Sequence, residues 1–446
     1  MWKPNIPNID GIEKALGYES FPTAPELYEN KSVLILGMGN SALETADSIY
    51  GHTQYVHILT RQPAINMAWD THYVGDIRSI NNNILDTFLL KSLDGITFLD
   101  LEDVSLHERG GKYYVIVDGH YLGSEYSRTN IPDNFALRGG YDVVIRCTGF
   151  TFDASIFNAT HISRPPGKAK KYPAINHAYE SIDFPGLFVA GTASHSLDLR
   201  KSAGGFIHGF RYTSQALSRL LEWRYEGVRW PSTTVPLDQV LNLVVKRLNE
   251  GSGFYQMFGI LGDVLIIDRE NDTATYLEEF PVNLLPHLLA TSGHKATEVI
   301  VVILDYGAPD MYTSKFEAVA SEAHKSYFLH PILFHYRQLP TEHDFVHKHP
   351  YDRLPRPDSI HHVVEDFLVV WQSTNEHIRP LRRWIESVLN RNLRHYFSDT
   401  CFEMAMTHST VPGSCERGLL RGQGLFGTPE LREVVQTRRV VMASLY

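Results

Sequence analysis

The sequence predicts an α/β fold with a doubly wound, Rossmann-type domain over residues 31–150. An apolar run from Val33 to Leu36 leads directly into the glycine-rich turn GMGNSA, and a helical pattern follows from Ser41. Further strand-like runs occur at YVHILTR and YDVVIRC, with a helical pattern between them. Strands that alternate with helices are typical of a parallel sheet with helices on its faces.

The remaining elements can be predicted in order along the chain. Residues 1–30 are rich in Pro, Asn and Glu and are interpreted as an extended connector. The expected elements are a helix over 41–50, a strand ending at Arg61, a helix over 78–93, a hairpin around Asp118-Gly119, a strand over 141–147, a strand within PGLFVAGTASH and a helix over 201–223. The stretch WPSTTVP looks like a linker, and mixed α and β patterns follow it, which places a domain boundary near 231.

The residues from Gly37 to Ala42 have the pattern G-x-G-x-x-A. Gly37 would permit a tight turn, Gly39 would let the backbone approach a diphosphate, and Ala42 would let the helix pack closely on the strand. Asn40 and Ser41 are expected to cap the helix, whose free N–H groups and dipole favour bound phosphate. The preceding strand and following helix predict a dinucleotide site, and a purely structural glycine turn is the alternative.

The end of the next strand indicates which dinucleotide would bind. NAD sites place Asp or Glu near this position for the ribose 2′-OH, whereas Arg suits the 2′-phosphate of NADP. This sequence has Thr60-Arg61-Gln62 there, with no adjacent acid. The pattern favours NADP(H), with Arg61 on the 2′-phosphate. An ordinary surface arginine at the end of a strand is the alternative.

A second glycine-rich region lies further along the chain. Gly191 and Thr192 end the run GLFVAGT, and Ser202, Gly204 and Gly205 lie in SAGG, the expected start of the long helix. Glycines in such places would let a flat cofactor approach backbone N–H groups. Close packing of a helix on a strand, with no ligand, is the alternative.

Composition and charge limit the possible partners. The chain has 446 residues with 43% hydrophobic content, as expected for a globular protein, and its net charge of −10 argues against a nucleic-acid partner. The longest apolar run, Val299–Leu304, is far shorter than the ~20 residues of a membrane span. The two ends carry neither a signal-peptide pattern nor a retention tetrapeptide.

The histidine and cysteine patterns predict no metal site. His343 and His347 have the i, i+4 spacing that suits a metal on a helix, but EHDFVHKHP ends in proline and has no cysteine partner. Cys147 is expected to be a buried thiol, and Cys401 and Cys415 form either a disulfide or two free thiols. Because the sequence has no C-x-x-C pair, a thioredoxin-like relay within this chain is not expected.

The order of these motifs resembles the flavin-containing monooxygenase-like flavoproteins, in which an NADPH domain is inserted into an FAD domain. The runs that carry the resemblance are PNIPNIDG, VLILGMGNSALETA, VIRCTGF and PGLFVAGTASH with KSAGGFIHGFRYTSQAL. The resemblance implies a connector and remnant of the FAD domain (1–30), an NADP(H)-binding Rossmann-like domain (31–150), the C-terminal part of the FAD-binding domain (151–230) and an α+β domain of unknown role (231–446).

The resemblance also implies a function, that of an oxidoreductase dependent on FAD and NADPH. GTASHSLDLRKSAGGFIHGFRYT is similar to a family member of the endoplasmic reticulum. This implies a location in the lumen of that compartment, with its degradation machinery and misfolded glycoproteins as partners. Residues 37–42 would then hold the NADPH pyrophosphate, and Gly191, Thr192 and the segment 202–205 would approach the flavin. The resemblance supplies no catalytic acid or base.

Two departures from the family pattern bear on the flavin. No G-x-G-x-x-G turn for the FAD pyrophosphate precedes GMGNSA, so the chain is expected to be an N-terminally truncated relative in which FAD binding is doubtful. The strand that commonly ends Gly-Asp beside the flavin ends here in Gly191-Thr192, which supplies no charge. A nucleotide-binding adaptor without enzymatic activity is therefore the alternative function.

Overall fold

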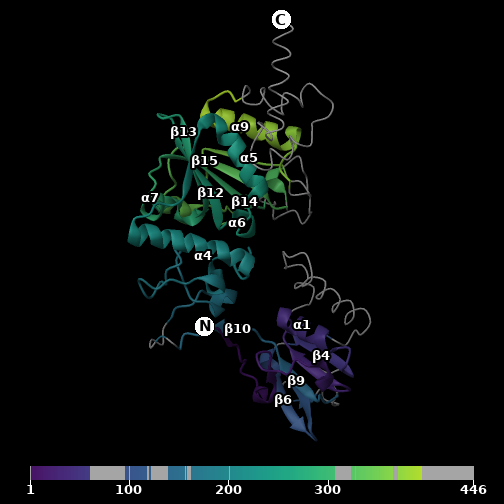
Figure 1. Ribbon diagram of the computed structural model, residues 1–446. Helices are drawn as coiled ribbons and strands as arrows, with labels where there is room; N and C mark the ends of the chain where they lie inside the picture. The colour runs from purple at the N-terminus through teal and green to yellow at the C-terminus, as the bar shows by residue number, and fades with distance from the viewer. Residues whose placement is uncertain are drawn as a thin grey trace. The chain divides into compact units, whose positions relative to one another are not determined.

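A computed structural model describes residues 2–60, 96–99, 101–117, 120–121, 139–155, 157, 162–199, 201–306, 323–326, 328–350, 352–364 and 370–393 (Figure 1). The chain forms two compact units, Met1–Tyr172 and Pro173–Tyr446. The predicted helix over 78–93, the turn at Asp118-Gly119, and Cys401 and Cys415 lie outside the described residues.

A parallel sheet organises the first unit. Its strands, in spatial order, are β2 (Leu16–Gly17), β9 (Val143–Arg146), β3 (Ser32–Leu36), β4 (Tyr55–Thr60) and β5 (Ile96–Phe98). Helix α1 (Asn40–Ile49) joins β3 to β4. These elements confirm the α/β, Rossmann-type prediction for this part of the chain.

Both faces of the parallel sheet are covered. On one face Val33 and Ile35 pack with α1, and on the other Leu34 and Leu36 pack with an antiparallel sheet. That sheet contains β6 (Val104–Arg109), β7 (Lys112–Val117) and β8 (His120–Tyr121). Every residue of β3 is buried because a parallel strand of this kind has a packed layer on each side, which explains the continuous apolar run in its sequence.

Residues 1–30, predicted as an extended connector with at most one short turn, contain two short strands and two 3-10 turns. Strand β1 (Trp2–Pro4) pairs with β10 (Phe150–Phe152), and β2 joins the edge of the parallel sheet. Ile9, Ile12 and Tyr28 are buried in the cores of the unit. These contacts join segments that are far apart in the sequence, so a local pattern cannot reveal them.

The second unit is built on an antiparallel sheet with helices on both faces (Figure 1). Its strands, in spatial order, are β11 (Ser232–Pro236), β13 (Thr273–Pro281), β12 (Leu261–Asp268), β14 (Glu298–Asp305), β15 (His330–Tyr336) and β16 (Ser359–His362). The helices are α4 (Ile207–Leu221), α5 (Val240–Glu250), α6 (Gly253–Gln256), α7 (Leu288–Ser292), α8 (Glu342–His347) and α9 (Arg379–Leu389).

Alternate residues of the central strands serve opposite faces of this sheet. Leu265 and Ile267 of β12 lie in a core with α5 and α9, whereas Val264 and Ile266 lie in a core with α4 and α7. Successive side chains of a strand point to opposite faces, so a strand covered on both sides is apolar throughout. The run DVLIID in β12 has this character.

The units divide between Tyr172 and Pro173, whereas the sequence placed boundaries at 150 and 230. Tyr179 and Leu217 share one hydrophobic core with β12, β13 and β14, so the segment before residue 231 packs on the sheet after it. The expected linker WPSTTVP begins with Trp230, which is 1% exposed, and continues as β11, which pairs with β13. The stretch is therefore a strand of the second unit and not a linker.

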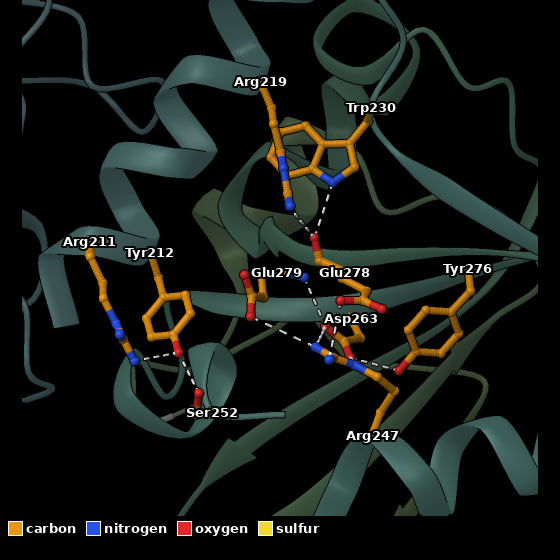
Figure 2. A network of polar contacts seen from close by, with 10 residues as sticks. All are labelled: Arg211, Tyr212, Arg219, Trp230, Arg247, Ser252, Asp263, Tyr276, Glu278 and Glu279. Carbon is orange, nitrogen blue, oxygen red and sulfur yellow. Dashed lines mark hydrogen bonds and ion pairs between the residues drawn. The ribbon is translucent and has the colours of Figure 1, made fainter. Parts of the chain in front are cut away.

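A buried carboxylate, Asp263 of β12, organises the polar contacts of this unit (Figure 2). It accepts hydrogen bonds from Arg247 Nε (2.8 Å), the Tyr276 hydroxyl (2.7 Å) and the Glu279 N–H (2.8 Å). The carboxylate lies at an irregularity in the pairing of β12 with β13, between Gly262 and Val264. A buried charge is tolerated only with such partners, so the network is expected to be important for stability.

Further hydrogen bonds fix α4 and the segment after it to β13 and to the start of α6 (Figure 2). The carbonyl of Glu278 accepts hydrogen bonds from Arg219 Nη1 (3.1 Å) and from Trp230 Nε1 (3.0 Å). The Tyr212 hydroxyl meets the hydroxyl of Ser252 beside α6. Polar and apolar contacts therefore both fix α4 to the sheet.

Strand β16 carries two histidines whose protonation is unfavourable. Burial lowers the pKa of His361 to about 4, and burial followed by the charges of neighbouring histidines lowers the pKa of His362 to about 3. His362 Nδ1 lies 2.9 Å from His330 Nε2, and His330 Nδ1 lies 2.8 Å from the Phe328 carbonyl. The carbonyl can only accept, so in this chain of bonds His330 Nδ1 carries a proton and His362 donates to His330.

We expect the second unit to lose stability as the pH falls from 7 to 5. An unfolded histidine binds its proton near pH 6.5, whereas folded His361 and His362 remain neutral there, so the unfolded chain binds more protons and is favoured. Urea unfolding at pH 7, 6 and 5 measures the effect. A variant with His361→Asn and His362→Asn should show a smaller drop in midpoint, and an unchanged drop would contradict the assignment.

Candidate functional site

Three neighbouring parallel strands, β9, β3 and β4, end at the carboxyl edge of the parallel sheet. Strand β3 lies between β4 and β9. After β3 the chain continues to β4 on one side, and it later returns as β9 on the other side. The edge beside β3 is therefore the topological switch point of the sheet. The Gly37 N–H donates to the Leu59 carbonyl (2.8 Å), and the Cys147 N–H donates to the Leu36 carbonyl (2.8 Å). Ligands of open α/β sheets bind at such a point.

Gly37 has a conformation and a neighbour that exclude a side chain. Its φ is +101°, a region that other residues rarely adopt. A Cβ at this position would lie 2.5 Å from the carbonyl oxygen of Cys147. The first glycine of the motif therefore allows the returning strand to pack against the turn.

Gly39 has a different role, because a Cβ there would have no atom within 4 Å and its φ of −86° suits any residue. It is the N-cap of α1, so the N–H groups of Asn40 and Ser41 have no acceptor within the helix. The space above Gly39 is thus lined by backbone donors at the positive end of a helix dipole. This arrangement fits a diphosphate.

The expectation that Asn40 and Ser41 cap α1 is wrong. The helix begins at Asn40, its N-cap is Gly39, and no side chain caps it. Both residues are already helical, so they offer the opening their backbone N–H groups. Ala42 is fully buried among Val33, Ile35 and Ile145 of the neighbouring strands, as close packing of the helix requires.

Arg61 lies outside the described residues, so its role on a 2′-phosphate stays a prediction. The preceding residue, Thr60, is buried and ends β4. Because β4 is parallel to β3 and pairs Leu59 with Leu36, Thr60 lies at the same edge of the sheet as the glycine turn.

Cys147 is buried and unoxidised, as predicted. Burial raises the pKa of its thiol to about 11, with a contact to Thr45 acting in the opposite direction. A thiol of this kind is unreactive at neutral pH. We therefore assign Cys147 a packing role at the switch point.

The second group of predicted residues belongs to the second unit, and the structure changes their context. The expected strand within PGLFVAGTASH is absent from this described segment, which has a single bridge at Phe188 and continues as a 3-10 helix, Gly191–Leu197. Helix α4 begins at Ile207, so the segment SAGG precedes it as turns. Thr192 lies within the 3-10 helix.

Asp198 organises this segment and was missed by the sequence argument. Its carboxylate is 2% exposed and accepts hydrogen bonds from His195 Nδ1 (2.8 Å), the Ser202 hydroxyl (2.5 Å) and the Gly204 N–H (3.0 Å). Ser202 and Gly204 therefore already donate to Asp198. The only sequence signal was the short spacing of these residues within HSLDLRKSAGG.

The glycines of this segment serve two purposes. A Cβ at Gly204 would lie 2.4 Å from an Asp198 oxygen, and one at Gly205 would lie 3.2 Å from the ring of His195, so both permit close packing. Gly209 also permits close packing, because a Cβ there would lie 2.0 Å from the carbonyl oxygen of Ala203. Gly191 differs, because a Cβ there would meet no atom within 4 Å.

An unpartnered polar group lies near the Asp198 carboxylate. Tyr179 is 2% exposed, its φ is +62°, and among the described residues its hydroxyl has no hydrogen-bond partner. Burial and then the charge of Asp198 raise the pKa of this tyrosine. The flavin contacts expected of Gly191, Thr192 and the segment 202–205 stay a prediction.

The fold and the glycine turn define a Rossmann-type, nucleotide-binding class of protein. The family model described as pyridine nucleotide-disulphide oxidoreductase matches residues 1–191. The chain is 46% identical to the mouse protein FAD-dependent oxidoreductase domain-containing protein 2 and 40% identical to its zebrafish (Danio rerio) counterpart. These matches cover 96% and 97% of this chain, and 67% and 68% of the relatives. The chain belongs to the family of these two proteins.

Some known structures have a distant likeness. The bacillithiol disulfide reductase of Bacillus cereus is 17% identical with a TM-score of 0.30, and the match covers 43% of this chain and 50% of that protein. The HOCl-induced flavoprotein disulfide reductase RclA of Escherichia coli is 11% identical with a TM-score of 0.32, covering 75% and 58%. This chain therefore spans about half the length of each of these reductases.

Within the described residues, no helix is long and apolar enough to cross a membrane. In the same part of the chain, no group of three or more His, Cys, Asp or Glu side chains is arranged to hold a metal ion.

Proposed function

We propose that the chain is part of an FAD- and NADPH-dependent oxidoreductase of the flavin monooxygenase-like type, whose first unit binds NADPH. The observation that carries the proposal is the open helix N-terminus at Gly39, which lies at the switch point beside the end of β4. The names of the mouse and zebrafish relatives support the flavin part of the proposal.

The residues of the first unit would hold the nucleotide in a defined way. Backbone N–H groups at Asn40 and Ser41 would bind the diphosphate, and Gly39 would leave room for its approach. Arg61 would contact the 2′-phosphate of the adenosine. When bound, a flavin supplies the redox chemistry, and the protein binds and orients the reactants and excludes water.

Replacing Arg61 by alanine is expected to weaken NADPH binding with little effect on NADH. The guanidinium would contact only the phosphate that distinguishes the two, and a charge-assisted contact of this kind contributes about 1.5–3 kcal/mol. Calorimetric titration of both nucleotides measures the ratio of affinities. An unchanged ratio of affinities would contradict the assigned role of Arg61, but it would not bear on phosphate binding by the glycine turn.

The visible spectrum of the purified chain separates the enzyme from an adaptor. Bound flavin absorbance supports the oxidoreductase, and a colourless protein that does not take up added FAD supports a nucleotide-binding adaptor. Phe206 and Ile207 at the start of α4 are 36% and 73% exposed, which is compatible with both functions. Such apolar exposure suits either a cofactor or a protein partner.

The proposed setting is the lumen of the endoplasmic reticulum, with the degradation machinery and misfolded glycoproteins as partners. Only the resemblance of the segment GTASHSLDLRKSAGGFIHGFRYT to a protein of that compartment supports it. Cells that lack the full-length protein should clear a misfolded secretory glycoprotein more slowly. Equal clearance with and without the protein would count against this setting.

A further inference from the structure

Helix α8 (Glu342–His347) presents two histidines on one exposed face. His343 and His347 are one turn apart, and their ring centroids lie 3.9 Å from each other with 25° between the planes. Side chains four residues apart lie on the same side of a helix, one above the other. The two imidazoles are therefore close enough to act together.

One of the rings already has a defined tautomer. His347 Nδ1 lies 2.8 Å from the backbone carbonyl of His343. A carbonyl can only accept, so Nδ1 carries the proton and Nε2 of the neutral ring has a lone pair. Histidines that bind metals almost always donate their other ring N–H to a carbonyl, a carboxylate or a water. His347 thus has the supporting hydrogen bond that a metal ligand requires.

The helix that carries both rings has a fixed start. The Thr341 hydroxyl accepts from the Asp344 N–H (3.2 Å), and the Asp344 carboxylate accepts from the Thr341 N–H (2.8 Å), a complete capping box. The capping box stabilises the first turn of α8, from which His343 projects, and so supports the one-turn spacing of the two histidines.

The sequence argued against a metal here because EHDFVHKHP ends in proline and has no cysteine partner. In the structure α8 ends at His347, and Pro350 lies beyond it, so the proline does not disturb the i, i+4 geometry. We propose that His343 and His347 form an open two-histidine site for a divalent transition metal that prefers imidazole, such as Zn²⁺. With two protein ligands, the other coordination positions remain for water or for a group from a binding partner.

Zinc titration of the metal-free chain tests this site. The wild-type protein, dialysed against chelator and then against buffer, is titrated with Zn²⁺ by calorimetry at pH 7.5. His343→Ala and His347→Ala should each weaken one binding event by about tenfold or more, because a two-point attachment becomes a single one. The double variant should lose that event. Circular dichroism confirms that the variants remain folded.

A matched control addresses the other histidines, of which the chain has 22 in total. His52→Ala removes an exposed histidine of the first unit and should leave the zinc isotherm unchanged. Zinc should also raise the thermal midpoint of the wild type and of the His52 variant, but not that of the double variant. Wild-type zinc binding in the double variant, or equal loss in the His52 variant, would overturn the proposal.

Discussion

Asp263→Ala is expected to destabilise the second unit by about 3–5 kcal/mol, because it leaves the Arg247 guanidinium buried without its main partner. The side chain of Arg247 is 12% exposed and that of Asp263 is fully buried. The variant also removes the acceptor of the Tyr276 hydroxyl and of the Glu279 N–H. Urea unfolding followed by the fluorescence of this unit's buried tryptophans measures the loss.

Glu278→Gln is the matched control for this experiment. Glu278 also pairs with Arg247, at 3.1 Å, but its side chain is 47% exposed. Solvent screens an exposed pair, so the loss should be about 1 kcal/mol or less. The backbone carbonyl of Glu278, which accepts from Arg219 and Trp230, is unchanged. Similar losses for the two variants would mean that burial of the Asp263 charge does not decide the stability.

The second large effect is expected for Gly37→Ala. The backbone at φ +101° is strained for any residue with a side chain, at a cost of about 1–3 kcal/mol. In addition, the new Cβ would lie 2.5 Å from the Cys147 carbonyl oxygen, so the turn or the returning strand must shift. We expect the first unit to unfold more easily and NADPH binding to fall below detection. Urea unfolding and nucleotide titration measure both losses.

Gly39→Ala separates binding from folding at the same turn. Its φ of −86° is unstrained and the space around a new Cβ is empty, so stability should change by less than about 1 kcal/mol. The methyl group would project into the proposed phosphate space, and NADPH affinity should fall about tenfold or more. Gly51→Ala, also in open space, controls for glycine replacement. NADPH affinity equal to that of wild type in Gly39→Ala would contradict the proposed site.

Much of the first unit could be predicted because its signals are local. The apolar run before Gly37 is β3, the helix expected over 41–50 is α1 (Asn40–Ile49), and the strand expected to end at Arg61 is described as far as Thr60. Each element has a periodicity and a boundary residue of its own. In contrast, β2 has two residues and depends on pairing with β9, so nothing in its own sequence distinguishes it from a loop.

In the second unit, local patterns predicted which residues are buried but not which residues they contact. Val189 is buried in an apolar run that suggested a strand, yet it packs against α4 and the antiparallel sheet without belonging to a ladder. Hydrophobicity predicted its burial correctly but could not predict which backbone would pair with it. Asp198 was missed for a related reason, since its three donors are brought together only by the path of the chain through residues 195–204.

The two sheets also differ in how soon each can assemble during synthesis. In the second unit β12 pairs with β13 and β14, and β14 pairs with β15, its near neighbours along the chain. In the first unit, the contact of Ser32 with Asp142 joins residues 110 positions apart. Distant pairings slow folding because a long loop must close first. During synthesis, β3 can pair with β4 first but must wait for β9, its second neighbour in the sheet. Until the ribosome has synthesised β9, the glycine turn after β3 lacks the strand that packs against it in the folded unit.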